Sequence, residues 1–322
     1  MKAIVYDTYG PPDVLRCDEI EKPTPADDEV LVRVRAASVN PLDWHFMRGS
    51  PYALRMMAGW SKPKVKRLGV DVAGSVEAVG RNVTGFKAGD EVFGSCRGAF
   101  AEYVCTPESA LVRKPGGVTF EQAAAVPVAA ITVLQCLRDR ARIQPGQRVL
   151  VNGAAGGVGT LAVQVAKALG AEVTGVCSTR NVEMVRSLGA DHVLDYTRED
   201  FTKGGIRYDV ILDMVTNHSL SACRRVLNPS GTYLMVGGSD GGMLGVVAVL
   251  IQAALLSWFT SQTLGLVLAK RSKPDLVAIA ALMEAGKVTP VIDRRYALAD
   301  VPAAIRYLEE GHARGKVIIT VE

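Results

Sequence analysis

Hydrophobic and polar positions follow a period of two in the N-terminal third of the chain. The stretch Glu29–Ala36 reads EVLVRVRA, with apolar residues at 30, 32, 34 and 36, which is the pattern of a half-buried strand. Gly-Pro and Gly-Asp clusters between such runs mark turns. Further strands are expected at Ala3–Tyr6, Val72–Val79, Ala99–Val104 and Leu111–Arg113. Residues 1 to 122 are therefore predicted to be rich in β-structure.

From Thr119 the pattern changes to helical stretches and short buried runs. Helices are expected at Phe120–Ala125, Ala129–Arg138, Thr160–Leu169, Val182–Leu188 and Leu220–Leu227. Strands are expected at Val149–Val151, Val173–Val176, His192–Leu194, Val210–Leu212 and Tyr233–Val236. Strands that alternate with helices in this way predict a doubly wound parallel sheet with right-handed crossovers.

The C-terminal part differs again. Helices are expected at Pro274–Ala285 and from Asp300 to Leu308, and strands at Val288–Ile292, Arg295–Leu298 and Lys316–Val321. We expect the last strand to complete the N-terminal sheet. The predicted domains are accordingly 1–122 with 272–322, interrupted by a parallel-sheet domain at 123–271.

The turn after Val149–Val151 has the sequence NGAAGGVGT. Its glycines at 153, 156 and 159 allow a tight turn and let a pyrophosphate approach the N–H groups that begin the next helix. Between a strand and a helix of a βαβ unit, this spacing is the dinucleotide-binding fingerprint; a plain glycine turn is the alternative. The backbone predicted to hold the phosphates is that of Ala155, Gly156, Gly157 and Val158.

The end of the second strand of this unit favours NADPH over NADH. NAD-binding units place an acid about 20 residues after the glycines, on the ribose 2′-hydroxyl. Here Val176 leads into Cys177-Ser178-Thr179-Arg180, and no acid follows until Glu183. Hydroxyls and a guanidinium suit a 2′-phosphate. Ser178 or Thr179 could equally cap the next helix, and both roles can hold together.

Composition and charge give no indication of nucleic-acid binding. The chain has 322 residues, 48% of them hydrophobic, and a net charge of +4, so nothing points to nucleic acid. Lys62, Lys64, Lys66 and Arg67 form a short basic cluster, interpreted as a solvated loop, with docking to acidic partners or lipid as the lesser alternative. The six cysteines form no C-x-x-C pair, and free thiols together with the lack of a signal-peptide core predict a cytoplasmic protein.

The stretch Gly241–Ala269 carries no charge. Its apolar part approaches the length of a membrane span, but glutamines, serines and threonines interrupt it. A buried helix beside a substrate pocket or a subunit interface is the favoured interpretation, and membrane contact is the less favoured one.

Motifs along nearly the whole chain resemble the medium-chain dehydrogenase/reductase superfamily, in its zinc-free quinone oxidoreductase and alkenal reductase branch. They are GVDVAGSVEAVGRNVTGFKAGDEVFG (69–94), AAGGVG (154–159), LGADHVLDY (188–196) and the tail AGKVTPVIDRRYALADVPAAIRYLEEGHARGKVIIT (285–320). The resemblance implies a GroES-like β-rich domain plus a Rossmann doubly wound parallel-sheet domain, with the active site in the cleft between them. It also implies a homodimer.

The chain departs from the zinc-dependent relatives where these bind metal. Asn40 stands in place of a catalytic cysteine, Val70 and Asp71 replace a His-Glu pair, and the four-cysteine structural lobe is missing. Thiolate and imidazole ligands are thus lacking at the matching positions, so no metal is expected and alcohol dehydrogenation is disfavoured. Quinones and α,β-unsaturated carbonyls remain as hydride acceptors, because their anionic products are stable enough without a metal; the sequence does not separate the two.

Site residues follow from the same resemblance. Asn40 is expected to line the cleft and donate its amide to substrate or cofactor, with an Asn-Pro turn as the alternative. Tyr52 and His45, on the adjoining loop, are candidate proton or hydrogen-bond donors, with an ordinary exposed loop aromatic or histidine as the alternative. Asp43 is expected to orient the loop backbone. Lys316 is expected near the cofactor, and a solvated lysine at a strand start is almost as well supported. Further residues expected at the cofactor are Ser178, Arg180, Tyr196, Val215, Gly237 and Gly238.

The leading hypothesis is an NADPH-dependent, zinc-independent reductase of quinones or enones. An NADPH-binding scaffold or sensor with vestigial catalysis, associated with a partner or membrane, is the alternative. A zinc-dependent alcohol dehydrogenase is the third.

Overall fold

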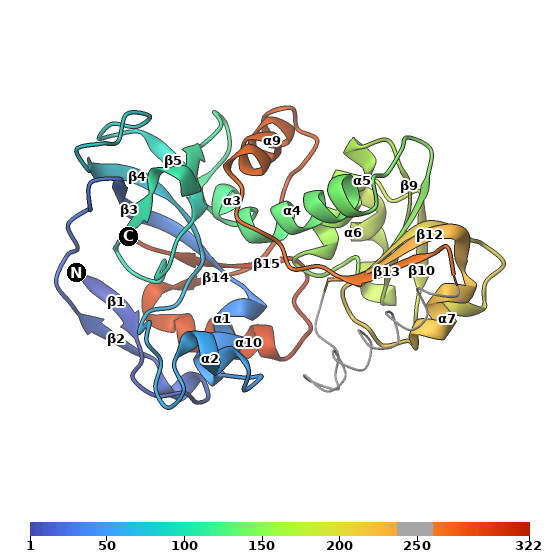
Figure 1. Ribbon diagram of the computed structural model, residues 1–322, viewed down its shortest axis with the longest axis horizontal. Coiled ribbons are helices and arrows are strands. Elements are labelled where there is room, and N and C mark those ends of the chain that lie inside the picture. The colour runs from blue at the N-terminus through green and yellow to red at the C-terminus, as the bar shows by residue number, and fades with distance from the viewer. Residues whose placement is uncertain (237–259) are drawn as a thin grey trace. The chain divides into compact units, whose positions relative to one another are not determined.

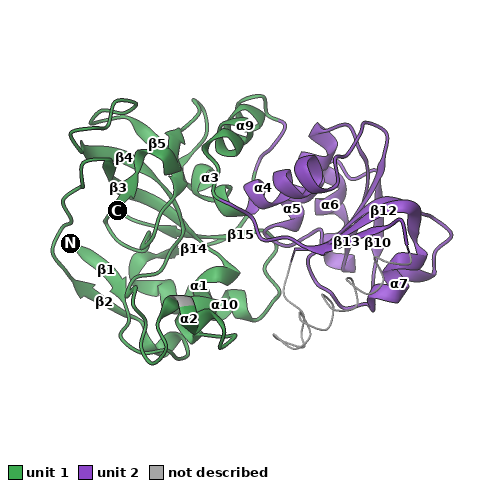
Figure 2. Ribbon diagram, viewed as in Figure 1, with its two compact units in different colours: residues 1–128, 271–286, 290–322 green, residues 129–270, 287–289 purple. Residues whose placement is uncertain are grey.

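The computed structural model describes residues 1–236 and 260–322 (Figure 1). It divides into two compact units (Figure 2), which are residues 1–128, 271–286 and 290–322 (unit 1) and residues 129–270 and 287–289 (unit 2). The domain limits expected from the sequence, after residues 122 and 271, stay a prediction.

Unit 1 is built on a seven-stranded sheet of order β14-β15-β3-β4-β5-β7, with β6 paired to β3. The strands are β14 (Ile292–Ala297), β15 (Lys316–Thr320), β3 (Glu29–Val39), β4 (Asp71–Val79), β5 (Glu91–Ser95), β7 (Leu111–Arg113) and β6 (Tyr103–Pro107), and a separate ribbon pairs β1 (Lys2–Val5) with β2 (Arg16–Glu19). β15 runs antiparallel to β3. The C-terminal strand thus completes the N-terminal sheet, as the sequence predicts.

The helices of unit 1 are α1 (Pro41–Arg48), α2 (Leu54–Ala58), α3 (Phe120–Ala124), α9 (Lys273–Glu284) and α10 (Val301–Glu309). α10 packs Val301, Ala304 and Ile305 into the apolar core of the β-rich unit. α1 was not predicted, because Asn40-Pro41 also suits a turn. Proline at the first helical position is compatible with a helix, since that N–H has no intrahelical acceptor.

Unit 2 holds a six-stranded parallel sheet of order β10-β9-β8-β11-β12-β13. The strands are β8 (Arg148–Asn152), β9 (Glu172–Cys177), β10 (His192–Asp195), β11 (Tyr208–Asp213), β12 (Leu227–Met235) and β13 (Thr263–Leu266), and the helices are α5 (Gly159–Ala168), α6 (Val182–Ser187) and α7 (Leu220–Arg225). α4 (Pro127–Leu134) carries the chain from unit 1 into unit 2. The strand order reverses between β8 and β11, the point where open α/β sheets bind ligands at their carboxyl ends.

Several local predictions were wrong. Val288–Ile292 is not a strand, because β14 begins only at Ile292. The strand expected at Arg295–Leu298 is the second half of β14, which ends at Ala297. The strand expected at Ala99–Val104 begins only at Tyr103. The helix expected at Ala129–Arg138 is present but longer, since it begins at Pro127 and continues as a π-helix over Gln135–Arg140. Isolated apolar runs do not define strand ends, which depend on the neighbouring strand.

The uncharged stretch Gly241–Ala269 lies outside the described residues up to 259. Its described end is not helical, since Thr263–Leu266 forms β13 and pairs in parallel with β12. None of the helices in the described ranges is long and apolar enough to cross a membrane.

The close crossing of β3 and β4 supplies a stability test. A Cβ atom on Gly74 would lie 2.0 Å from the carbonyl oxygen of Arg33, so Gly74→Ala should push the two strands apart and cost about 3 kcal/mol of unfolding free energy. Gly116 has no atom within 4 Å of such a Cβ, and Gly116→Ala is the matched control. Equal urea midpoints for the two variants, followed by circular dichroism, would contradict the packing described here.

Candidate functional site

Strand register brings four polar side chains together inside unit 1. β3 pairs with β4 so that Ser38 faces Asp71, and β15 pairs with β3 so that Val317 faces Val39. The residues next to the second pair, Lys316 and Asn40, are therefore neighbours although 276 positions separate them. Lys316 is 4% exposed and Asp71 fully buried. We call Ser38, Asn40, Asp71 and Lys316 the Lys316 cluster.

Hydrogen bonds fix the orientation of Asn40 within this cluster. Lys316 Nζ donates to Asn40 Oδ1 at 2.7 Å. Asn40 Nδ2 donates to Asp71 Oδ2 at 2.9 Å and to the Ser38 carbonyl oxygen at 3.2 Å. A side-chain amide has two N–H donors, and both are engaged here. In this geometry the Asn40 amide is hydrogen-bonded within the cluster, and its expected donation to substrate or cofactor stays a prediction.

The Lys316 cluster contains a buried ion pair. Lys316 Nζ lies 3.8 Å from Asp71 Oδ2, and the Ser38 hydroxyl donates to the same oxygen at 2.9 Å. Burial raises the pKa of the Asp71 carboxyl, and the Lys316 charge opposes that rise. Burial lowers the pKa of Lys316, and Asp71 opposes that fall. The alternative of a solvated lysine at the strand start was wrong.

Asp43 links the start of α1 to the segment before β4. Its carboxylate accepts hydrogen bonds from Asn40 N at 2.8 Å and from Gly69 N at 2.9 Å, the first of which closes a capping box at the helix N-terminus. Burial raises the pKa of the Asp43 carboxyl to about 7. These contacts agree with the expectation that Asp43 orients loop backbone.

His45 and Tyr52 lie on and after α1, and no described contact joins them to the Lys316 cluster. His45 Nδ1 lies 2.8 Å from the Ser50 carbonyl oxygen, and its ring stacks on Trp44 with centroids 3.7 Å apart. Tyr52 is 69% exposed, with the Arg55 guanidinium 4.6 Å from its ring centroid. Tyr52 Oη accepts or donates no hydrogen bond among the described residues, so its hydroxyl is the more accessible of the two candidate donors.

The glycine turn of unit 2 has the close backbone contacts that a phosphate site needs. Gly153 has φ +87°, and a Cβ on Gly159 would lie 2.0 Å from the Gly153 carbonyl oxygen. At Gly156 a Cβ would meet only one atom, at 3.5 Å. The hydroxyl of Thr160, in the first turn of α5, is buried without a hydrogen-bond partner among the described residues. A buried donor of this kind at a helix N-terminus fits an anionic ligand.

The carboxyl ends of β9 and β10 carry the residues expected at a 2′-phosphate. Ser178 Oγ accepts from Asn181 Nδ2 at 3.1 Å, Arg180 is exposed, and Tyr196 is 58% exposed. Thr179 donates its hydroxyl to Asp195 Oδ2 at 2.5 Å. This hydrogen bond lowers the pKa of Asp195 and takes the Thr179 hydroxyl away from a ligand.

Two further residues lie at the carboxyl ends of these strands and were not predicted. Asp195 ends β10, the strand beside β9, and pairs with Cys177 in the parallel register. Arg198 follows β10 and lies 3.6 Å from Asp195. The sequence of β9 alone does not reveal Asp195, because the pairing of β10 with β9 brings it there. The residues expected at the 2′-phosphate therefore have an acid, Asp195, beside them, although Arg198 adds a second cation to Arg180.

Asp213, at the end of β11, is a further residue that the sequence did not single out. It is fully buried. Its Oδ1 accepts from Asn152 Nδ2 at 2.8 Å and from the backbone N–H groups of Val215 and Thr216 at 3.1 and 2.8 Å, while Oδ2 accepts from Tyr233 Oη at 2.9 Å. Asp213 thus fixes the backbone of the loop that carries Val215, which is 40% exposed. This loop lies at the carboxyl end of the parallel sheet.

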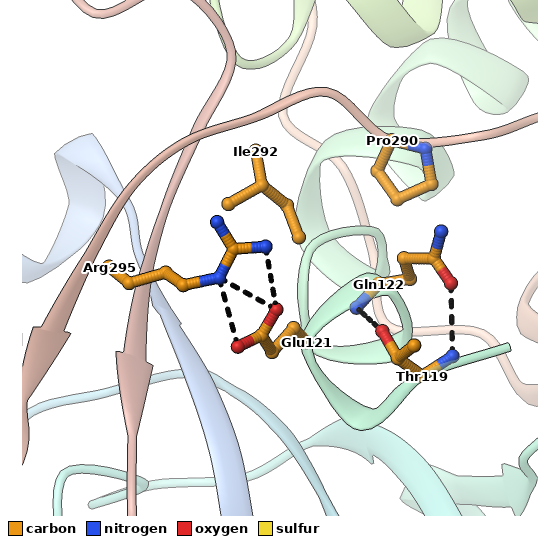
Figure 3. Close-up of a pocket in the computed structure, with 6 residues that line it drawn as sticks. All are labelled: Thr119, Glu121, Gln122, Pro290, Ile292 and Arg295. Atoms are coloured by element: carbon orange, nitrogen blue, oxygen red, sulfur yellow. Dashed lines mark hydrogen bonds and ion pairs between the residues drawn. The ribbon is translucent and has the colours of Figure 1, made fainter.

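Gly237 and Gly238 lie outside the described residues. In the described ranges no group of three or more His, Cys, Asp or Glu side chains is placed to hold a metal. A cavity of about 310 Å³ in unit 1 (Figure 3) contains no predicted site residue; the charged side chains that line it, Glu121 and Arg295, pair with each other at 2.9 Å.

Comparisons with known proteins agree with these features. An alcohol dehydrogenase GroES-like domain matches residues 26–116, and a zinc-binding dehydrogenase model matches residues 188–319. The mitochondrial NAD(P)H oxidoreductase RTN4IP1 of Mus musculus is 35% identical over 357 residues, covering 100% of this chain and 89% of that protein. The chloroplastic NADPH-dependent alkenal/one oxidoreductase of Arabidopsis thaliana is 33% identical over 335 residues, covering 99% and 79%.

Among solved structures, the Escherichia coli quinone oxidoreductase complexed with NADPH superimposes with a TM-score of 0.84. It is 26% identical and covers 99% of this chain and 100% of its own. The prediction of a cytoplasmic location was wrong on this evidence, because the curated relatives named above are mitochondrial and chloroplastic.

The ion pair in the Lys316 cluster can be tested by a double-mutant cycle. Lys316→Met leaves Asp71 buried without its counter-charge, so it should cost about 3–5 kcal/mol of unfolding free energy. Adding Asp71→Asn removes the uncompensated charge, so the double variant should recover part of that loss. Additive losses in chemical denaturation would contradict a direct interaction between the two groups.

Asp43 should make stability depend on pH. Its pKa is raised from 3.8 to about 7, so between these values the folded chain holds a proton that the unfolded chain has lost. The stabilisation is complete below about pH 4 and disappears as the pH rises to 7. The difference in unfolding free energy between wild type and Asp43→Asn should fall across this window. Glu19→Gln, at an exposed position of β2, is the control, and a flat difference for Asp43→Asn would contradict the assignment.

Proposed function

Because the chain belongs to the medium-chain dehydrogenase/reductase superfamily, in its zinc-free quinone oxidoreductase and alkenal reductase branch, we propose that it transfers hydride from NADPH to quinones or α,β-unsaturated carbonyl compounds. The observation that carries the proposal is the glycine turn between β8 and α5, with its buried Thr160 hydroxyl, in a chain whose metal-ligand positions hold Asn40 and Val70. A nicotinamide cofactor fits this turn, and a metal-activated alcohol does not fit these side chains.

The turn fits the pyrophosphate of the cofactor for steric and electrostatic reasons. Gly156 leaves room for close approach of an anion, and the first turn of α5 presents N–H groups and the positive end of the helix dipole. The Thr160 hydroxyl would gain the acceptor that it lacks among the described residues. When bound, the nicotinamide supplies the hydride.

Selectivity for NADPH is assigned to the edge formed by β9 and β10. Arg180 is the principal ligand of the 2′-phosphate, with Ser178 and Tyr196 as hydrogen-bonding groups and Arg198 as a second cation. Asp195 does not repel the phosphate strongly in this assignment, because Thr179 and Thr197 donate to its oxygens and Arg198 lies beside it. Bidentate guanidinium–phosphate contacts are stronger than neutral hydrogen bonds.

On the substrate side, the reaction needs orientation, exclusion of water and a donor to the oxygen on which negative charge develops. Tyr52 is the proposed donor because its hydroxyl is exposed, and His45 is the second candidate. Asn40, Asp43 and Lys316 act indirectly, since they hold the first turn of α1 in place. We also propose that the protein acts as a homodimer, as the resemblance to its family implies.

The cofactor assignment gives a specific test. Arg180→Ala should raise KM for NADPH by roughly tenfold or more and leave KM for NADH nearly unchanged, because the lost contact is to the 2′-phosphate alone. Arg186→Ala is the matched control, since Arg186 is exposed on α6 and pairs with Glu183. Cofactor oxidation is followed spectrophotometrically against a panel of quinones and enones. No oxidation of either cofactor with any acceptor would overturn the reductase and favour a cofactor-binding scaffold, and equal KM changes for the two cofactors would overturn the 2′-phosphate assignment only.

A further inference from the structure

α2 and the loop that follows it present apolar and basic side chains to solvent. Five of the ten exposed large apolar side chains in the described part of the chain fall between residues 42 and 65. The most exposed of these, Met56 and Trp60, are 74% and 73% accessible, and Val65 is 43% accessible. Lys62, Lys64 and Lys66 lie between and beside them and are exposed as well. We call these six residues the 56–66 patch.

Hydrogen bonds hold the backbone of this loop at both of its ends and to Tyr9. Lys64 N donates to the Ala58 carbonyl oxygen at 2.8 Å, which closes the loop. Gly59 allows the turn with φ +115°, and a Cβ there would lie 2.1 Å from the Lys62 carbonyl oxygen. Tyr9 Oη donates to the Gly59 carbonyl oxygen at 2.6 Å, and Pro63 is buried. Trp60 and Lys62 therefore lie at the tip of an anchored loop.

The chain segment that carries the patch has charges of one sign. Between residues 44 and 70 the sequence contains six Lys and Arg residues and no Asp or Glu. Lys66 pairs with Asp7 at 2.7 Å, which leaves Lys62 and Lys64 as the two patch cations with no ion pair among the described residues. A solvated loop would account for these lysines, but not for Met56 and Trp60 exposed beside them, because large apolar surface in water is unfavourable.

We propose that the 56–66 patch docks on the surface of an anionic phospholipid membrane. Trp and apolar tips enter the boundary between headgroups and acyl chains, while lysines bind the lipid phosphates. A nucleic acid or an acidic peptide would engage the lysines without covering Met56 and Val65. A second copy of the patch would bring like charges together. The proposal does not depend on the reaction assigned above, and it describes peripheral contact only.

The experiment uses the full chain and extruded vesicles in a flotation assay. Binding is compared between phosphatidylcholine vesicles and the same vesicles with phosphatidylglycerol added, at low and high salt. We expect binding to the anionic vesicles alone, weakened by salt. Lys62→Gln with Lys64→Gln should weaken it by roughly tenfold or more, since each lysine near an anionic surface contributes about a fivefold gain. Lys87→Gln with Lys287→Gln removes the same charge elsewhere on the exposed surface and should have little effect.

A second measurement reports insertion of the tip. Brominated phospholipids should quench tryptophan fluorescence in the wild type, and Trp60→Ser should lose most of that quenching and bind roughly tenfold more weakly. Leu268→Ser, at a side chain 76% exposed outside the patch, is the apolar control. Thermal unfolding midpoints check that every variant is folded.

Three outcomes would overturn the proposal. The first is equal binding to neutral and anionic vesicles, or none to either. The second is vesicle binding that the paired lysine exchange leaves unchanged. The third is self-association without vesicles that Trp60→Ser abolishes, which would identify a second copy as the occupant. Because none of these readouts measures turnover, failure here leaves the proposed reductase activity intact.

Discussion

The ammonium group of Lys316 lies inside unit 1, and a buried charge is tolerated only with an opposite charge and hydrogen-bond acceptors around it. Asp71 and Asn40 supply these, at 3.8 and 2.7 Å. Their positions are available only if β15 pairs with β3 and β3 with β4 in the observed registers. A one-residue slip of either pair would turn these side chains to the other face of the sheet. The ion pair therefore constrains the centre of the sheet.

The same constraint extends to the proposed substrate side. Asn40 is held by Lys316 through its side chain and by Asp43 through its backbone N–H, so the first turn of α1 has a fixed position relative to the sheet. His45 lies on that helix, and Tyr52 follows it. A rigid base of this kind is what a site needs when it works by orientation and hydrogen bonding rather than through a strong Lewis acid.

In unit 2 a buried carboxylate likewise holds a loop backbone in place. Asp213 is buried and accepts hydrogen bonds from two backbone N–H groups of the loop that follows it. The glycine turn, the Asp213 loop and the residues after β9 and β10 all lie at carboxyl ends of parallel strands. The fold thus brings the glycine turn and the side chains proposed to bind the cofactor to the same end of the sheet, as the strand order requires.

The sequence by itself determined the two kinds of sheet, the strand–turn–helix at 148–168 and the cofactor class, because periodicity and glycine spacing are local properties. It also identified Asn40, Val70 and Asp71 at the positions where the zinc-dependent relatives bind metal. Only the tertiary structure decided what those residues contact. Asn40 was expected to face substrate, but its amide is engaged by Asp71 and Ser38. Asp195 was not predicted for the same reason: it meets Cys177 and Thr179 through the pairing of β10 with β9, and pairing register is not visible along one segment of chain.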